Sequence, residues 1–136
     1  MKSPQRIEFL TDVLITAVEH CGYGWFAVKE YTCDGEDPYA LIEELYEERP
    51  TKYRLDMNVV ARGISVIRQA VLKTPTNRPD EGLVLHNART GQRLFMSESL
   101  RSTILESSRE NDAGEIDVVG ALAVVECGLF GYVQYC

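Results

Sequence analysis

Carboxylates are the most unevenly distributed reactive groups in this sequence. Residues 30–48 contain eight acidic side chains and no basic ones. These are Glu30, Asp34, Glu36, Asp37, Glu43, Glu44, Glu47 and Glu48. The whole chain carries 21 acidic and 14 basic side chains, a net charge of −7, so nearly all of the imbalance lies in this stretch, which we call the acidic segment. Closely spaced carboxylates can attract a basic protein surface or imitate the phosphates of a nucleic acid.

We predict that the acidic segment binds a partner, with Tyr39 and Tyr46 as aromatic anchors among the carboxylates. The predicted partner is a basic protein surface, such as that of a nucleic-acid-binding complex, and not nucleic acid itself. The plain alternative is a solvated polar face, which is what charge runs usually are, with tyrosine rings that pack on the helices. The absence of Lys and Arg in the segment keeps the binding hypothesis open, because an ordinary solvated face mixes both signs.

A small enzyme is the alternative hypothesis. His20 and Cys21 could serve as base and nucleophile, but neighbouring residues on a helix point about 100° apart. His86 could bind a phosphate together with Arg89 and Arg93, or it could belong to a polar turn. None of the common nucleophile, phosphate-loop or zinc-protease motifs is present. A third hypothesis is a regulatory subunit or antitoxin-like protein that binds through its tyrosines.

The cysteines do not predict a metal or cofactor. Cys21, Cys33, Cys127 and Cys136 form no Cys-x-x-Cys pair, and paired close ligands are what a zinc site needs. The N-terminal residues have no signal-peptide core. The longest apolar run, 118–133, contains Glu126 and three glycines and is too short to span a membrane. We therefore expect no metal, no cofactor and no membrane contact, and a location in the cytoplasm of the host cell.

The elements that would position these residues can be read in the first half of the chain from periodicity and turn residues. Apolar residues at three- and four-residue intervals predict a helix that begins at Ser3-Pro4 and stops at Gly22 and Gly24. Aromatic and β-branched residues predict a strand over 25–32. Residues 39–48 fit either a helix or a strand, and the Asp34-Gly35 turn favours a strand in a hairpin. Lys52 to Leu55 should extend the sheet.

The second half should contain three more helices. Asp56 should cap the second, which should end near Lys73. Ser97 or Ser99 should cap the third, and Asp117 the last. The last helix, 118–130, is apolar all round, which is typical of a helix in the centre of a domain.

Three further features of this half follow from its residue types. Residues 83–85 and 93–96 could form a short hairpin, and 132–135 a closing strand. Glu126 needs a partner inside the apolar helix, and Arg62 is the candidate. Together these features predict an α+β fold in a single domain, 1–136, with about four helices and a short antiparallel sheet.

Three stretches of the sequence resemble small uncharacterised proteins of actinobacterial phages and plasmids. They are residues 9–19 with 22–25, residues 60–64 and residues 121–131. That group has no established activity, so the resemblance assigns no site residue. It implies a setting of mobile elements, where small acidic proteins that block restriction or CRISPR systems are common. The resemblance and the acidic segment together predict an inhibitor of a host defence complex, of the anti-CRISPR or anti-restriction type.

Overall fold

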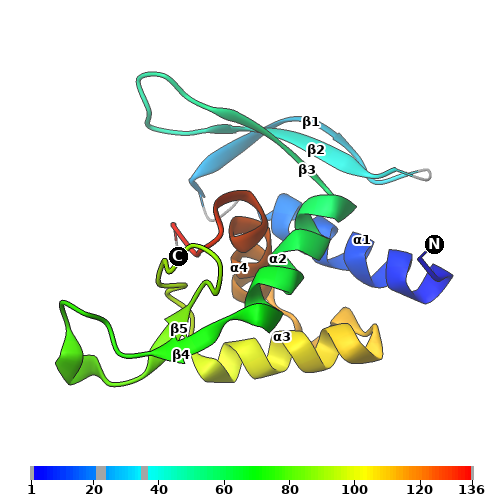
Figure 1. Ribbon diagram of the computed structural model, residues 1–136. Helices are drawn as coiled ribbons and strands as arrows, with labels where there is room; N and C mark the ends of the chain where they lie inside the picture. Colours follow the sequence, from blue (N-terminus) through cyan, green and yellow to red (C-terminus); the bar gives the residue numbers. More distant parts are fainter. Residues whose placement is uncertain (1, 21–23, 35–36, 136) are drawn as a thin grey trace.

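Four α-helices and two small antiparallel sheets make up the part of the chain that the structure describes (Figure 1). The structure is a computed structural model, and it describes residues 2–20, 24–34 and 37–135. The helices are α1 (Pro4–Glu19), α2 (Met57–Gln69), α3 (Glu98–Glu110) and α4 (Val118–Phe130). The strands are β1 (Phe26–Thr32), β2 (Tyr39–Glu44), β3 (Lys52–Asp56), β4 (Val71–Lys73) and β5 (Val84–His86). Two 3-10 helices, η2 (Pro79–Glu81) and η3 (Ala113–Glu115), lie in loops. The predicted α+β fold is confirmed.

Each α-helix begins at a residue whose side chain accepts a hydrogen bond from a backbone amide of the first turn. The first amides of a helix have no partner within it, so such a cap stabilises the helix start. The capping residues are Ser3, Asp56, Ser97 and Asp117. The sequence predicted all four, with Ser97 rather than Ser99 as the cap of α3.

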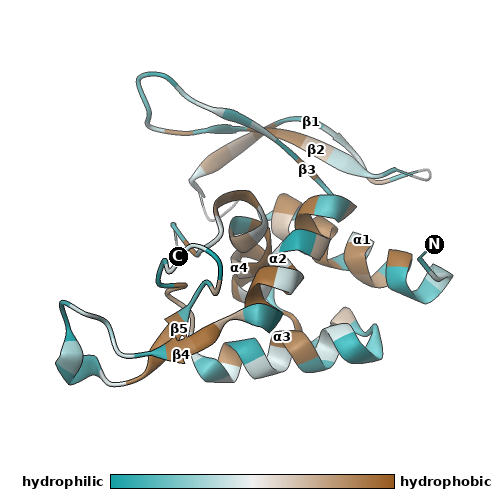
Figure 2. Ribbon diagram, in the orientation of Figure 1, coloured by the Kyte–Doolittle hydropathy of each residue, from teal (hydrophilic) through white to brown (hydrophobic). Residues whose placement is uncertain are grey.

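Helix α4 lies in the centre of the molecule, as predicted. Residues 120–127 are all buried, and Figure 2 shows the apolar colouring of this helix among the other elements. Helix α2 packs so closely on α4 that each contributes a glycine to the contact. A Cβ atom on Gly63 would lie 1.9 Å from the carbonyl oxygen of Val124, and one on Gly128 would lie 2.1 Å from that of Val59. Only glycine allows this approach.

The larger sheet has the strand order β1-β2-β3, with both pairs antiparallel. It packs over the helices through a buried row that includes Phe26, Ile42 and Leu55. Residues 39–44 therefore form a strand, the alternative that the hairpin turn favoured. The β1–β2 register shifts between Val28 and Glu30, a bulge that bends the strand.

The end of α2 was predicted wrongly. The helix ends at Gln69, and Val71–Lys73 instead form β4, which pairs with β5. Arg101 of α3 explains this end, because its guanidinium donates to the carbonyl oxygens of Ile67, Arg68 and Ala70 at 3.0–3.1 Å. These bonds satisfy carbonyls that a longer helix would have used.

The two other predicted strand pairings are also changed. Residues 93–96 form no strand, but they meet β5 at a bridge between His86 and Arg93 and through the amide of Leu94, which donates to the carbonyl of Leu85 at 3.0 Å. Strand β5 also pairs with β4. Residues 132–135 form no strand. The amide of Val133 donates to the carbonyl of Leu94 at 2.9 Å, which ties this tail to the loop before α3.

Glu126 holds the rest of the tail. Its fully buried carboxylate accepts hydrogen bonds from the amides of Gln134, at 3.0 Å, and Tyr135, at 2.6 Å. The expectation that Arg62 pairs with it was wrong, because Arg62 Nε donates to the carbonyl of Gly128 at 3.4 Å. The buried carboxylate of Glu126 therefore holds the backbone of the C-terminal tail in place. Among the described helices, none has both the length and the apolar character needed to cross a membrane.

Candidate functional site

The larger sheet divides the acidic segment between its two ends. Asp34 and Asp37 lie in the turn between β1 and β2, whereas Glu47 and Glu48 lie in the loop between β2 and β3. Strand β2 separates these two groups, and its six residues span about 20 Å. Figure 1 shows the turn and the loop at opposite ends of the sheet. Glu36 lies outside the described residues. The carboxylates are thus displayed at two places and not as one patch.

Strand β3 neutralises part of this charge, although it lies outside the acidic segment. Arg54 Nη2 lies 3.1 Å from a carboxylate oxygen of Asp37, and Lys52 Nζ lies 4.0 Å from one of Glu43. The Arg54 guanidinium also lies 4.2 Å above the ring centre of Tyr39. These residues meet because β3 pairs with β2 in antiparallel register.

Two further carboxylates of the segment accept hydrogen bonds inside the domain. Glu30 accepts one from the hydroxyl of Tyr39, and this bond raises the pKa of Tyr39. Glu44 accepts from the amide of Thr51 at 2.9 Å and from the hydroxyl of Tyr135 at 2.8 Å. The hydrogen bonds from Thr51 and then Tyr135 hold the pKa of Glu44 below its ordinary value. Half of the segment is therefore part of the sheet's own structure.

The loop between β2 and β3, residues 45–51, is where the segment projects furthest into solvent; we call it the hairpin loop. Tyr46 has 94% of its surface exposed, and Glu47 and Glu48 beside it are exposed as well. None of the ion pairs in the described part of the chain includes Glu47 or Glu48. One exposed aromatic ring thus stands next to two carboxylates, and we call these three residues the hairpin tip.

The base of the hairpin loop is fixed although its tip is exposed. The amide of Leu45 donates to the carbonyl of Trp25 at 2.8 Å, and that of Glu44 to the carbonyl of Thr51 at 3.1 Å. The Trp25 ring stacks on the ring of Tyr135, with centroids 4.3 Å apart and planes 10° apart. The hydroxyl of Tyr135 in turn binds Glu44. A packed aromatic cluster therefore supports the loop from the core side.

The backbone of Tyr46 adopts a conformation that is costly for its residue type. Its φ is +66°, and the only other non-glycine residues with positive φ in the described part of the chain are Phe95 and Asn111. Asn111 ends α3, where asparagine tolerates this geometry. For a bulky residue the cost is about 1–2 kcal/mol. Residues with a strained backbone cluster at functional sites. The sequence around Tyr46 contains no pattern that predicts this strain.

The other aromatic residues near the acidic segment mostly pack, as the plain alternative expected. Trp25 is buried, and Tyr31, Tyr39 and Tyr53 are half buried. Tyr23 lies outside the described residues. Of the two tyrosines predicted as anchors, Tyr46 is therefore far more accessible than Tyr39.

The two histidines lie on different elements and each is tied to backbone. His20 is exposed at the end of α1, and its Nδ1 donates to the carbonyl of Thr16 at 2.9 Å. His86 is buried in β5, and its Nδ1 donates to the carbonyl of Val84 at 2.9 Å. Cys21 lies outside the described residues. Among the residues that the structure describes, no three His, Cys, Asp or Glu side chains gather in a way that could hold a metal ion.

Comparisons with protein-family models, curated proteins and solved structures find no significant match to this chain.

Proposed function

We propose that this chain is a non-enzymatic binding protein that docks its hairpin tip, Tyr46, Glu47 and Glu48, onto a basic surface of a partner protein. The observation that carries the proposal is the strained backbone of Tyr46 together with its 94% exposure. A buried ring can offset backbone strain through the apolar surface that it removes from water. The ring of Tyr46 removes almost none in the free protein, and a partner that covers the ring supplies that burial.

The charges beside the ring define the partner's chemistry. Glu47 and Glu48 would meet Lys or Arg side chains, and tyrosine is among the residues that contribute most to binding at the centre of an interface. The proposed partner is a nucleic-acid-binding complex of a host defence system, whose basic surface serves its own ligand. This choice rests on the resemblance to phage and plasmid proteins. The site is narrower than the predicted 30–48, because other carboxylates of that segment already have partners within the domain.

Charge reversal at the tip tests the proposal. The double variant Glu47→Lys/Glu48→Lys is compared with Asp34→Lys/Asp80→Lys, which changes the net charge equally at exposed residues elsewhere. Each variant and the wild type are immobilised and exposed to the same actinobacterial lysate, and retained proteins are quantified by mass spectrometry. We expect the wild type and the control to retain the same basic proteins, and the tip variant to lose them. These proteins should elute from the wild type as the salt concentration rises. Equal retention by all three would contradict a role for the tip.

A further inference from the structure

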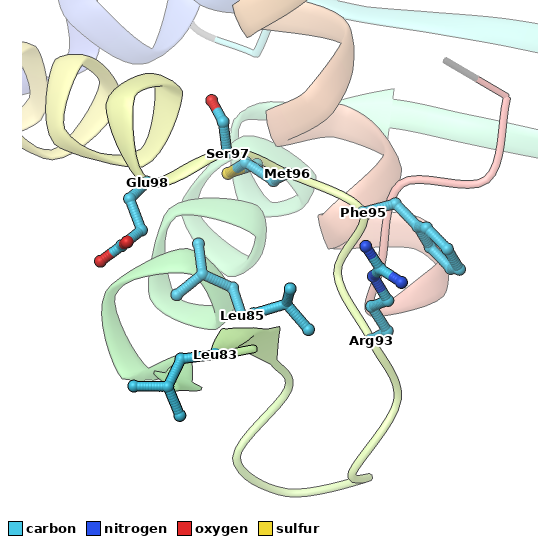
Figure 3. A pocket seen from close by; sticks show the side chains of 8 residues that line it. Leu83, Leu85, Arg93, Phe95, Met96, Ser97 and Glu98 are labelled. Carbon is cyan, nitrogen blue, oxygen red and sulfur yellow. The ribbon is translucent and has the colours of Figure 1, made fainter. Parts of the chain in front are cut away.

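The second exposed aromatic residue with positive φ, Phe95, lies at a hollow that the proposed function does not use. Its φ is +60° and 54% of its surface is exposed. The hollow has a volume of about 480 Å³ and is lined on its apolar side by Leu83, Leu85 and Met96. Leu83 is itself 63% exposed. Figure 3 shows Leu83 and Leu85 on one side of the lining and Arg93 and Phe95 on the other.

A second hollow of about 490 Å³ adjoins the first, and both are bounded by Arg93 and Phe95. Its lining is polar and includes Thr76, Asn77, Arg78 and His86. Because Arg93 and Phe95 line both hollows, we treat the two as one groove with an apolar end and a cationic end. Glu98, the one acidic residue that lines it, is at the apolar end, away from Arg78.

The guanidinium groups of the cationic end are held in place before any ligand arrives. Glu81 bonds to Arg93 through one carboxylate oxygen and lies 3.3 Å from Arg78 Nε through the other. The Arg93 guanidinium also lies 5.1 Å from the ring centre of Phe95. One carboxylate thus serves two guanidinium groups, each of which has five N–H donors, so positive charge and donors remain for a ligand.

The charge of this region is opposite to that of the chain. Residues 71–98 carry four basic side chains and three acidic ones, whereas the chain as a whole has a net charge of −7. A ligand that fills both ends of the groove must therefore combine an apolar group with an anion.

We propose that the groove binds an extended peptide segment of a partner that carries an apolar side chain and, two residues later, a carboxylate. In an extended chain, residues two apart point to the same side and lie about 6.5–7 Å from each other. Such a segment places its apolar side chain between Leu83 and Met96 and its carboxylate against Arg93 and Arg78. The protein then has two binding surfaces, an acidic tip and a cationic groove.

The peptide acetyl-Gly-Leu-Ser-Asp-Gly-amide is the probe, titrated into the full-length protein and followed by amide chemical shifts in NMR. We expect saturable shifts confined to residues 76–78, 83–86 and 91–98. Replacing the Asp of the peptide by Asn, or its Leu by Ala, should weaken binding about five-fold each, since each loses one of the two contacts. The absence of saturable shifts, or equal binding of the three peptides, would overturn the proposal. Equally tight binding of hexanoate would also overturn it, because the groove would then take any amphipathic carboxylate.

Variants of the protein separate a site from general attraction. Arg93→Gln should weaken binding of the probe about five-fold or more. Arg89→Gln removes the same charge from a neighbouring residue that lines neither hollow, and it should leave binding within two-fold of the wild type. Phe95→Asn removes the ring beside the Arg93 guanidinium, so it should weaken binding about five-fold without lowering the thermal midpoint, because asparagine tolerates positive φ. The proposed site would be wrong if the two arginine variants lost equal affinity for the probe, or if Phe95→Asn bound it as tightly as the wild type.

Discussion

Tyr46 and Phe95 are the residues at which local energetics and exposure disagree most. Both hold bulky side chains in a left-handed backbone conformation and both are exposed, Tyr46 to 94% and Phe95 to 54%. A strain of about 1–2 kcal/mol is a sizeable share of the 5–15 kcal/mol by which domains are stable. In the free protein Tyr46 buries almost no surface that could offset this strain, whereas Phe95 buries just under half of its surface. The same two residues lie at the two surfaces that we assign to binding.

Tyr135 links the tail to the sheet, and its hydroxyl should make stability depend on alkaline pH. Burial, and then the hydrogen bond to Glu44, raise the pKa of Tyr135 well above its ordinary value, and burial raises the pKa of Tyr31 to about 12. The folded protein therefore favours the neutral phenols. Their contribution is complete below about pH 10, the unfolded value, and is lost as pH rises further.

Tyr135→Phe tests this dependence. The variant keeps the ring that stacks on Trp25 and loses the hydrogen bond to Glu44. We expect its free energy of unfolding at neutral pH to fall by about 1 kcal/mol or less. Between about pH 9.5 and 11, urea denaturation should also show that the variant loses less free energy of unfolding than the wild type does. Tyr46→Phe is the matched control, and a pH dependence that Tyr135→Phe leaves unchanged would contradict the assignment to this residue.

At the scale of elements, the contact between α2 and α4 depends on glycine. Gly63→Ala would gain about 1 kcal/mol from helix propensity. Its Cβ would however stand 1.9 Å from a backbone oxygen of α4, which forces the helices apart. We expect the steric cost to win, with a net loss of at least about 2 kcal/mol in thermal or urea denaturation. Ser102→Ala, at an exposed position of α3, should change stability by less than about 0.5 kcal/mol. Equal stability of the two variants would rule out the close contact.

The last turns of three helices are joined to other elements by arginines. Arg101 binds carbonyls at the end of α2, Arg6 binds the carbonyl of Ser108 near the end of α3, and Arg62 that of Gly128 in α4. The final carbonyls of a helix lack partners within it, and a cation there also interacts favourably with the helix dipole.

Arg101→Gln should therefore cost about 1–3 kcal/mol, because it removes three charge-assisted hydrogen bonds at one helix end. Arg89→Gln, which removes the same charge at an exposed position outside the helices, is the control and should cost less than about 0.5 kcal/mol. Chemical denaturation of both variants measures the difference. If the two lose stability equally, the end of α2 does not depend on Arg101.

The sequence predicted the elements that local chemistry specifies. The helix caps, the central position of α4 and the β1–β2 hairpin all follow from residues close together in the chain. The end of α2 depends on Arg101, about thirty residues away, and the apolar Val71 and Leu72 suggested more helix. The candidate site was harder to predict from the sequence than the fold. The acidic segment was visible, but its division between two sheet ends follows from strand length, and the backbone of Tyr46 has no sequence signature.

At the scale of the whole molecule, charge is separated. The hairpin tip and the β1–β2 turn carry most of the unpaired carboxylates of the acidic segment that the structure describes, whereas the groove around Arg93 is cationic. Figure 1 places the hairpin loop and the β4–β5 sheet on opposite sides of the helices. The packed core between them, built around α4, holds the two surfaces in a fixed relation. We propose that the two surfaces bind chemically different partners.

We propose that the tip keeps a strained, exposed tyrosine for binding, and the variant Tyr46→Asn tests this role most directly. Asparagine tolerates the left-handed conformation and lacks the aromatic ring. Denaturation and capture of the proteins that the wild type retains are measured on the same preparation. We expect the free energy of unfolding of the variant to be higher than that of the wild type by about 0.5–1 kcal/mol, and capture to be reduced at least about five-fold. Lower stability, or capture equal to that of the wild type, would contradict it.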